Sequence, residues 1–313
     1  MMKSQNGNHP ADTPFIPDRP AQDGREFVGR SHAIESVKSA LSQAPVNNPL
    51  VICGPQGTGK TSLMYQLAGG ALDENVGVLY ADFQAMTLSN LSAFLWQLAK
   101  SIMVALNQQG LDGPTIEKRM LVLNPQLVFR QRFWNPLLNK ARNTPLLLAW
   151  DNFDSLADSS NGDHNLPTLR AYLFGLLETD APLDVLLAIT GRVEALGVNA
   201  LSPFHLERSL RLANLSKEET LQLVKRSDRF PVFEPVAGLI YELTAGHPGD
   251  TQRLCQALYD RHRERRHGQV TATDVLAILQ QDLAPSDFVG TVHRRLGKTD
   301  YVFGRPSSRR HTQ

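Results

Sequence analysis

The chain has 313 residues, of which 42% are apolar, and its formal net charge at pH 7 is +1. This length and apolar content allow two modest domains with proper cores. The small net charge argues against a protein that coats nucleic acid or membrane with its whole surface, although a local basic patch would not show in the sum. The two cysteines, Cys53 and Cys255, lie far apart, which argues against a disulfide framework or a zinc site. No apolar run is long enough to span a bilayer and the N-terminus lacks a signal-peptide core, so we expect a cytoplasmic protein.

The N-terminal arm comes first. Residues 1–24 are rich in Asn, Pro, Asp and Gln and have no hydrophobic periodicity. We therefore expect this arm to be mostly disordered or draped over the surface, with residues 13–17 as a more apolar patch. A helical pattern follows, in which Ile34, Val37 and Leu41 share one apolar face.

A glycine-rich segment at residues 49–67 carries the clearest signal in the chain. It begins with a short apolar strand over residues 50–53, continues through a turn and runs into a helix. The turn has the pattern G-x-x-x-x-G-K-[ST], in which glycines let consecutive backbone N–H groups face a phosphate. Lys60 would reach the β- and γ-phosphates of a nucleotide, and the hydroxyl of Thr61 would bind Mg²⁺. The residues expected around the nucleotide are Gly54, Pro55, Gln56, Gly57, Thr58, Gly59, Lys60, Thr61 and Ser62.

Further strands alternate with helices in the first two thirds of the chain. An amphipathic helix is predicted over residues 91–106, and helical pieces lie within residues 125–141. This alternation implies right-handed crossovers, and so an α/β fold with a doubly wound, mostly parallel sheet whose site lies at the carboxyl ends of the strands. The further strands are predicted over residues 77–83, 145–150, 183–189 and 209–212.

Charged residues follow two of these strands. Asp151, at the end of a buried apolar strand, is the expected partner of Mg²⁺, reached through water ligands. Asp154 is the remaining carboxylate able to polarise an attacking water; its alternative role is to cap the helix that begins near Ser155. Arg192 follows the next strand and is either suited to a bidentate contact with the γ-phosphate or a solvated arginine in a turn.

Only helical patterns follow Ser216. Ser216 and Glu219 form a capping box, a second helix covers residues 236–243, a third starts at Pro248, and Thr271 caps a fourth. We therefore predict an arm over residues 1–24, a P-loop nucleotide-binding domain over residues 25–212, a small all-α lid domain over residues 213–285, and a loosely ordered basic tail over residues 286–313.

Several phrases of the sequence point together to one family. They are TPFIPDRP followed by FVGR, the loop GPQGTGKTS, the strands LLLAWDNFD and LLAITGR, the phrase LANLSKEET, and the segment YELTAGHPGDTQRLCQAL. With these phrases, which run from Pro14 to about Leu283, the chain resembles the STAND ATPases, the signal-transduction ATPases with numerous domains. These belong to the AAA+-related ASCE group of P-loop ATPases, and the chain is most similar to their prokaryotic and archaeal-type relatives.

This resemblance implies further site residues. The resemblance implies that the nucleotide is ATP or ADP. It also implies that the turn formed by Gly246, His247 and Pro248 closes over the nucleotide from the helical domain. The same turn also suits the end of one helix and the start of the next, and both roles can hold together. The resemblance also implies that the base pocket is formed in part by Phe27, Val28, Gly29 and Arg30.

Two departures from the family pattern affect the expected activity. Many such ATPases have a glutamate directly after the aspartate that corresponds to Asp151, whereas this chain has Asn152, which cannot take a proton. Turnover is therefore expected to be slow. Family members also commonly carry a further module after the helical domain, so we expect any output to come from the tail, a homo-oligomer or a separate effector protein.

The leading hypothesis is an ATP-binding regulatory switch with slow Mg²⁺-dependent hydrolysis. One alternative is a DNA-associated AAA+-like ATPase of the initiator or transposition type, supported by arginines in residues 253–266 and by the basic tail. Another is a nucleotide-binding scaffold that does not hydrolyse ATP.

Overall fold

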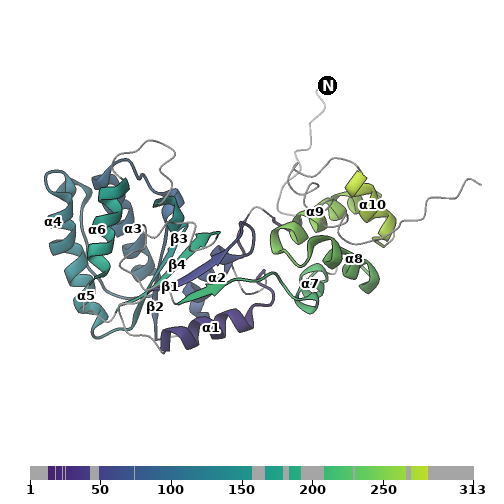
Figure 1. The fold of residues 1–313 in the computed structure, drawn as a ribbon, viewed down its shortest axis with the longest axis horizontal. Helices are drawn as coiled ribbons and strands as arrows, with labels where there is room; N and C mark the ends of the chain where they lie inside the picture. The colour runs from purple at the N-terminus through teal and green to yellow at the C-terminus, as the bar shows by residue number, and fades with distance from the viewer. Residues whose placement is uncertain are drawn as a thin grey trace, which may run out of the picture. The chain divides into compact units, whose positions relative to one another are not determined.

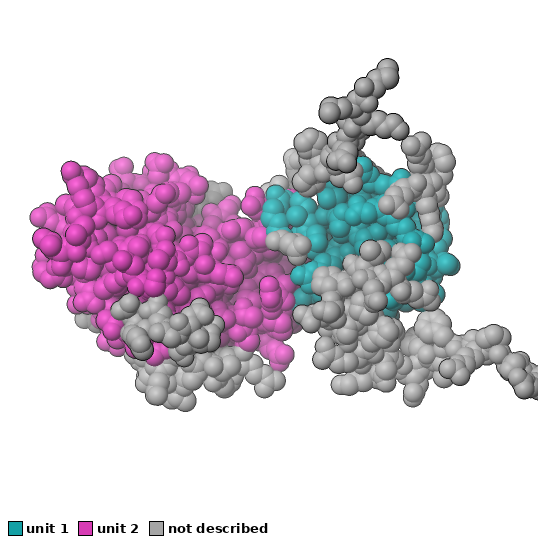
Figure 2. All heavy atoms as spheres, turned by 90° about the horizontal axis from the view of Figure 1, so that it is seen from above, with its two compact units in different colours: residues 1–19, 214–313 teal, residues 20–213 magenta. Residues whose placement is uncertain are grey.

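The chain divides into two compact units, which Figure 2 colours separately. The structure is a computed structural model, and it describes residues 13–17, 19–22, 24, 26–42, 49–73, 75–156, 166–178, 183–191, 208–227, 230–265 and 269–280. The core unit is Pro20–Ala213, and the helical unit combines Met1–Arg19 with Asn214–Gln313. Sequence reasoning did not predict that the first residues group with the helical unit.

A sheet of five parallel strands forms the centre of the core unit, which confirms the predicted α/β fold. The order is β2-β3-β4-β1-β5, so one strand, β4, lies between β1 and β3. The carboxyl ends of all the strands therefore meet at one edge of the sheet. The strands are β1 (Leu50–Gly54), β2 (Gly77–Asp82), β3 (Leu146–Asp151), β4 (Leu183–Thr190) and β5 (Ser209–Arg211).

Successive strand residues pack into two hydrophobic clusters, one on each face of the sheet. Leu146, Leu148 and Trp150 of β3 belong to one cluster, and Leu147 and Ala149 belong to the other. All residues of β3 are buried. This two-sided burial explains why the strand reads as an unbroken apolar run.

Helices cover both faces of the sheet (Figure 1). α1 (Ser31–Ser42) and α2 (Lys60–Gln66) pack on the face of Leu147, and the opposite face is covered by α3 (Leu91–Gln108), α4 (Pro125–Phe129), α5 (Asn135–Ala141) and α6 (Leu166–Leu177). Short irregular helices complete the core unit. Within the described residues they are the π-helical turns η2 (Leu67–Ala71) and η5 (Arg130–Trp134) and the 3₁₀ turns η3 (Phe83–Ala85), η4 (Lys118–Leu121) and η6 (Phe153–Leu156).

The helical unit has helices where the sequence predicted them. The capping box of Ser216 and Glu219 is present, and Thr271 accepts a hydrogen bond from the backbone N–H of Asp274 at 3.4 Å. The helices are α7 (Lys217–Val224), α8 (Glu234–Thr244), α9 (Pro248–Arg265) and α10 (Ala272–Gln280).

The N-terminal segment is anchored in the core of the helical unit by Phe15. This side chain is 0% exposed, and its ring lies edge-on to Phe230 with centroids 5.1 Å apart. The guanidinium of Arg226 lies 5.0 Å from the centroid of the Phe15 ring and also donates to the carbonyl oxygen of Pro14. The apolar patch at residues 13–17 is therefore a packing element of the helical unit.

Two general predictions can be compared directly with the structure. Cys53 and Cys255 are both buried and free, so they form no disulfide with each other. Within the described part of the chain, none of the helices has the length and apolarity needed to cross a membrane.

Candidate nucleotide-binding site

The predicted phosphate-binding loop lies between β1 and α2, in the expected strand–turn–helix order. Gly57 and Gly59 have φ angles of 78° and 90°, which glycine adopts without strain. A Cβ on Gly54 would lie 3.0 Å from Oγ1 of Thr58, so the loop folds closely back on the end of β1. Thr58 is fully buried, whereas the loop tip, Pro55, Gln56 and Gly57, is exposed.

The ammonium group of Lys60 lies inside this loop. Its Nζ donates to the carbonyl oxygens of Gly54 and Pro55 at 2.8 and 3.0 Å. Burial lowers the pKa of Lys60, and the nearby carboxylates of Asp151 and Asp154 counteract that shift. The loop therefore encloses a cation that is held by neutral carbonyl groups and is available to pair with an anion.

A further contact in the site joins Thr61 to Asp151. The Thr61 hydroxyl is hydrogen-bonded to the Asp151 carboxylate, which is 0% exposed. The Tyr80 hydroxyl also donates to Asp151, at 3.2 Å. Burial raises the pKa of Asp151, and the hydrogen bonds from Thr61, the backbone N–H of Asn152 and Tyr80 oppose this shift.

These residues fit a magnesium ion. Mg²⁺ takes oxygen ligands and typically uses one or two carboxylates together with substrate phosphates. Thr61 and Asp151 supply a hydroxyl and a carboxylate that already share a hydrogen bond. The described residues contain no group of three or more His, Cys, Asp or Glu arranged to hold a metal.

Asp154 contacts β4 and does not cap a helix through its side chain in the described hydrogen bonds. Its Oδ2 accepts a hydrogen bond from the backbone N–H of Thr190 at 3.0 Å, which ties the ends of β3 and β4 together. The next residue, Gly191, donates from its backbone N–H to the carbonyl oxygen of Gly54 at 3.4 Å. The end of β4 thus lies beside the phosphate-binding loop. Arg192, the predicted γ-phosphate contact, lies outside the described residues.

Sequence reasoning missed Asp82, which the structure joins to Asn152. The amide Nδ2 of Asn152 donates to Oδ1 of Asp82 at 2.8 Å, and Asp82 is the register partner of Asp151. Asn152 has a φ of +52°, which is uncommon for a residue other than glycine. One signal was available: Asp82 lies next to the end of the strand predicted over residues 77–83, and Asp151 directly follows the strand predicted over residues 145–150.

The segment of residues 27–30, predicted to line the base pocket, is tied to the loop by Arg30. Its guanidinium donates to the carbonyl oxygen of Thr58 at 2.9 Å and to that of Ala213. Arg30 is 8% exposed and has a φ of +68°. Its side chain therefore holds the phosphate-binding loop through the carbonyl oxygen of Thr58.

The turn at residues 246–248 is tightly constrained within the helical unit. Gly246 has a φ of +69°, and a Cβ on it would lie 2.1 Å from the carbonyl oxygen of Leu215. The backbone N–H of Asp250 donates to Nδ1 of His247 at 3.2 Å. Pro248 opens α9, so the predicted helix boundary is confirmed.

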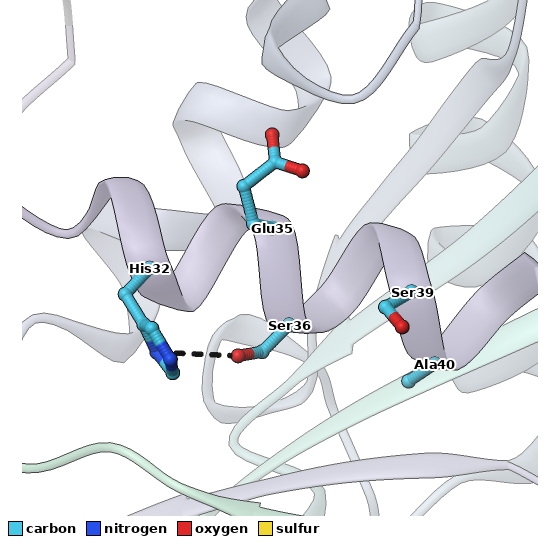
Figure 3. A pocket seen from close by; sticks show the side chains of 5 residues that line it. All are labelled: His32, Glu35, Ser36, Ser39 and Ala40. Atoms are coloured by element: carbon cyan, nitrogen blue, oxygen red, sulfur yellow. Dashed lines mark hydrogen bonds between the residues drawn. The ribbon is translucent and has the colours of Figure 1, made fainter.

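A separate hollow of about 420 Å³ lies along α1, outside the loop region (Figure 3). Its lining residues among those that the structure describes come from that one helix, and the ring of His32 is hydrogen-bonded to the Ser36 hydroxyl at 3.3 Å. The remaining lining residues are Glu35, Ser39 and Ala40.

The parallel sheet, the G-x-x-x-x-G-K-[ST] loop and the buried Thr61–Asp151 pair define a P-loop nucleoside triphosphatase fold. The family model for the AAA ATPase domain matches residues 26–187, which is more than half of the chain. The chain therefore belongs to the AAA ATPase domain family. Among curated proteins, no sequence matches it.

Solved structures of AAA+ proteins share the fold at low sequence identity. The ORC2 protein of Aeropyrum pernix, in ADPNP–ADP complexes, is 18% identical with a TM-score of 0.53, covering 85% of this chain and 74% of that one. Drosophila ORC bound to DNA is 14% identical with a TM-score of 0.53, covering 92% and 71%. A variant of Thermotoga maritima RuvB is 16% identical with a TM-score of 0.50, covering 83% and 71%.

Proposed function

We propose that this protein is a Mg²⁺-dependent ATPase that acts as a nucleotide-controlled regulatory switch. The observation that carries the proposal is the hydrogen bond between Thr61 and the buried Asp151, with the ammonium of Lys60 held in the adjacent loop. Lys60 and Thr61 supply a cation and a hydroxyl, and Asp151 supplies a carboxylate at the end of its strand. Together these groups suit a nucleoside triphosphate that binds with a divalent metal ion. The adenine base is proposed from the family to which the chain belongs.

Each residue has a defined task in this proposal. The backbone N–H groups of the loop bind the β-phosphate, and Lys60 leaves the carbonyl oxygens of Gly54 and Pro55 to pair with the β- and γ-phosphates. Thr61 and Asp151 hold Mg²⁺, which when bound neutralises charge on the phosphate oxygens. We place Asp154 and Arg192 beside the terminal phosphate. The negative charge of Asp154 raises the pKa of Lys60. Because Asn152 stands where many relatives have a glutamate, hydrolysis is slow.

The switch is proposed to involve the turn at residues 246–248. Asn214 donates from Nδ2 to the carbonyl oxygen of Ala245 at 2.9 Å, and Leu215 donates from its N–H to that of Gly246 at 2.8 Å. The segment that follows the core unit is thus bonded to the turn proposed to contact the nucleotide. We propose that ATP and ADP engage this turn differently, and that the difference controls closure of the lid on the core and assembly with a second copy or a separate effector in the cytoplasm.

A second candidate is a DNA-associated ATPase, because Drosophila ORC, solved bound to DNA, shares the fold. Arginines of α9 would supply the phosphate contacts. However, Arg253 lies 3.8 Å from Asp250 and Arg261 lies 3.5 Å from Asp274, and both pairings weaken a basic surface. Binding to duplex DNA whose affinity falls steeply with salt would favour this candidate.

The test of the proposed function is ATP binding by calorimetry, with and without Mg²⁺, and molecular mass by light scattering. We expect Lys60→Ala to bind at least about 100-fold more weakly, because loss of a charge-assisted contact costs about 3 kcal/mol. We also expect the mass with ATP to differ from the mass with ADP. Equal affinity in Lys60→Ala would reject the assignment of the loop, and an unchanged mass would reject nucleotide-controlled self-assembly.

A further inference from the structure

The structure brings a carboxylate from the neighbouring strand, Asp82, to the side chain of Asn152. β2 and β3 are parallel neighbours in register, so Asp82 and Asp151 end side by side at the carboxyl edge. Asn152 follows Asp151 and donates from Nδ2 to Oδ1 of Asp82 at 2.8 Å. The side chain beside the metal-binding aspartate is therefore hydrogen-bonded to a carboxylate from the next strand.

The backbone at Asn152 is fixed in the conformation that makes this contact. Its left-handed φ of +52° is held by two hydrogen bonds: the N–H of Asn152 donates to Oδ1 of Asp151 at 2.9 Å, and its carbonyl oxygen accepts from the N–H of Ser155 at 3.0 Å. A conformation of this kind costs about 1–3 kcal/mol and persists where its surroundings over-determine it.

Aromatic packing holds the same two strand ends in place. Phe83 directly follows Asp82, and Phe153 directly follows Asn152. Their ring centroids lie 5.6 Å apart, and the Phe83 centroid lies 5.2 Å from that of Trp150. All three side chains are buried, so Asp82 and Asn152 have little freedom to move apart.

The two carboxylate oxygens of Asp82 differ in their hydrogen bonds. Its Oδ1 accepts from Asn152 and from the backbone N–H of Gln84 at 2.9 Å, and the described hydrogen bonds give Oδ2 no partner. The side chain is partly exposed, whereas that of Asp151 is fully buried. Asp82 and Asp151 are register partners on adjacent strands, and the negative charge of Asp82 contributes to the raised pKa of Asp151.

From this geometry we propose that Asp82 is the carboxylate that orients and deprotonates the attacking water, with Asn152 positioning it. The inference rests on the proposed ATPase function. In the step, the water oxygen forms a bond to the γ-phosphorus, the bond from that phosphorus to the β,γ-bridging oxygen breaks, and its electron pair stays on ADP. The proton that the water loses passes to Oδ2 of Asp82 and then to solvent, and the products are ADP and inorganic phosphate.

The test uses the full chain and compares Asp82→Asn, Asp154→Asn and the exchange variant Asp82→Asn/Asn152→Asp. Asp82→Asn keeps an oxygen that can accept from Asn152 and Gln84, so it removes the charge and leaves the structural contacts. The exchange variant keeps the hydrogen-bonded pair and moves its carboxylate to position 152, directly after β3. The readouts are kcat, the ATP dissociation constant, the Mg²⁺ concentration for half-maximal rate, and the thermal midpoint.

We expect Asp82→Asn to lower kcat at least about tenfold, with the ATP affinity, Mg²⁺ requirement and thermal midpoint unchanged. The exchange variant should recover most of that loss, and Asp154→Asn should lose less than Asp82→Asn. The inference is overturned by an unchanged kcat in Asp82→Asn, by an exchange variant no faster than Asp82→Asn, by a larger loss in Asp154→Asn, or by a raised Mg²⁺ requirement in Asp82→Asn. A wild-type chain that binds ATP without turnover would instead refute the ATPase function itself.

Discussion

The guanidinium of Arg30 donates a hydrogen bond to the carbonyl oxygen of Thr58 at 2.9 Å, which ties the segment before α1 directly to the phosphate-binding loop. The same guanidinium donates to the carbonyl oxygen of Ala213, the last residue of the core unit. One buried cation therefore holds both the loop that is proposed to bind ATP and the end of the unit that carries it.

Replacing Arg30 should weaken both stability and nucleotide binding. Arg30→Met keeps much of the apolar volume but leaves two backbone carbonyl oxygens without their donor, so we expect the free energy of unfolding to fall by about 2–4 kcal/mol. We also expect weaker ATP binding, because the backbone of the loop loses its support. Urea unfolding and calorimetry measure the two effects, and a variant that matches the wild type in both would show that the contact is dispensable.

Gly246 should tolerate no side chain. In Gly246→Ala, the added Cβ would lie 2.1 Å from the carbonyl oxygen of Leu215, and the left-handed backbone adds about 1–2 kcal/mol of strain. We expect a loss of at least about 2 kcal/mol in unfolding free energy. Gly238 is the matched control, because it lies inside α8 and a Cβ there meets nothing within 4 Å. Gly238→Ala should be neutral or stabilising, and equal losses in the two variants would contradict this account.

Phe15 should contribute to the stability of the helical unit although it lies far before α7 (Lys217–Val224) in the sequence. Phe15→Ala removes a fully buried ring from its contacts with Phe230 and Arg226, so we expect a loss of about 3–5 kcal/mol. The control is Phe233→Ala in the same unit, since Phe233 is 56% exposed and its loss should cost far less. Chemical unfolding followed by circular dichroism measures both. A Phe15 variant as stable as the Phe233 variant would show that the N-terminal segment does not pack as described.

Asp151 is expected to lower the stability of the nucleotide-free protein while being required for Mg²⁺-dependent hydrolysis. Burial raises its pKa, so the ionised carboxylate is held at a cost at neutral pH, above its unfolded-state pKa, and that cost disappears as the pH falls and the group is protonated. Asp151→Asn removes the charge at similar volume and should raise the thermal midpoint of the nucleotide-free protein by about 2–4 °C while abolishing Mg²⁺-dependent hydrolysis. A lower midpoint together with retained turnover would contradict both halves of this prediction.

The parts of the site that could be predicted are local in sequence. The glycine spacing predicted the turn between β1 and α2, and the unbroken apolar run before Asp151 predicted a buried strand that ends in a carboxylate. These patterns work because strand burial and loop geometry depend on neighbouring residues.

The contacts that sequence reasoning missed join residues distant in sequence. Asp82 and Asn152 are in contact because β2 and β3 are adjacent and in register. The hydrophobic periodicity of a strand does not predict which strand lies beside it. Arg30 donates a hydrogen bond to Ala213, 183 residues later in the chain, and Phe15 packs on Phe230. Such contacts follow from tertiary packing, which local propensity does not determine.

The central claim is that the loop at residues 54–62 hydrolyses ATP, and multiple-turnover release of phosphate from ATP and Mg²⁺ tests it most directly. Wild-type protein and Lys60→Ala would be compared at matched concentrations after identical purification. We predict slow but measurable turnover in the wild type and a rate in Lys60→Ala that is lower by at least about 100-fold. Equal rates in the two proteins, or no turnover in a wild-type chain that binds ATP tightly, would contradict the account.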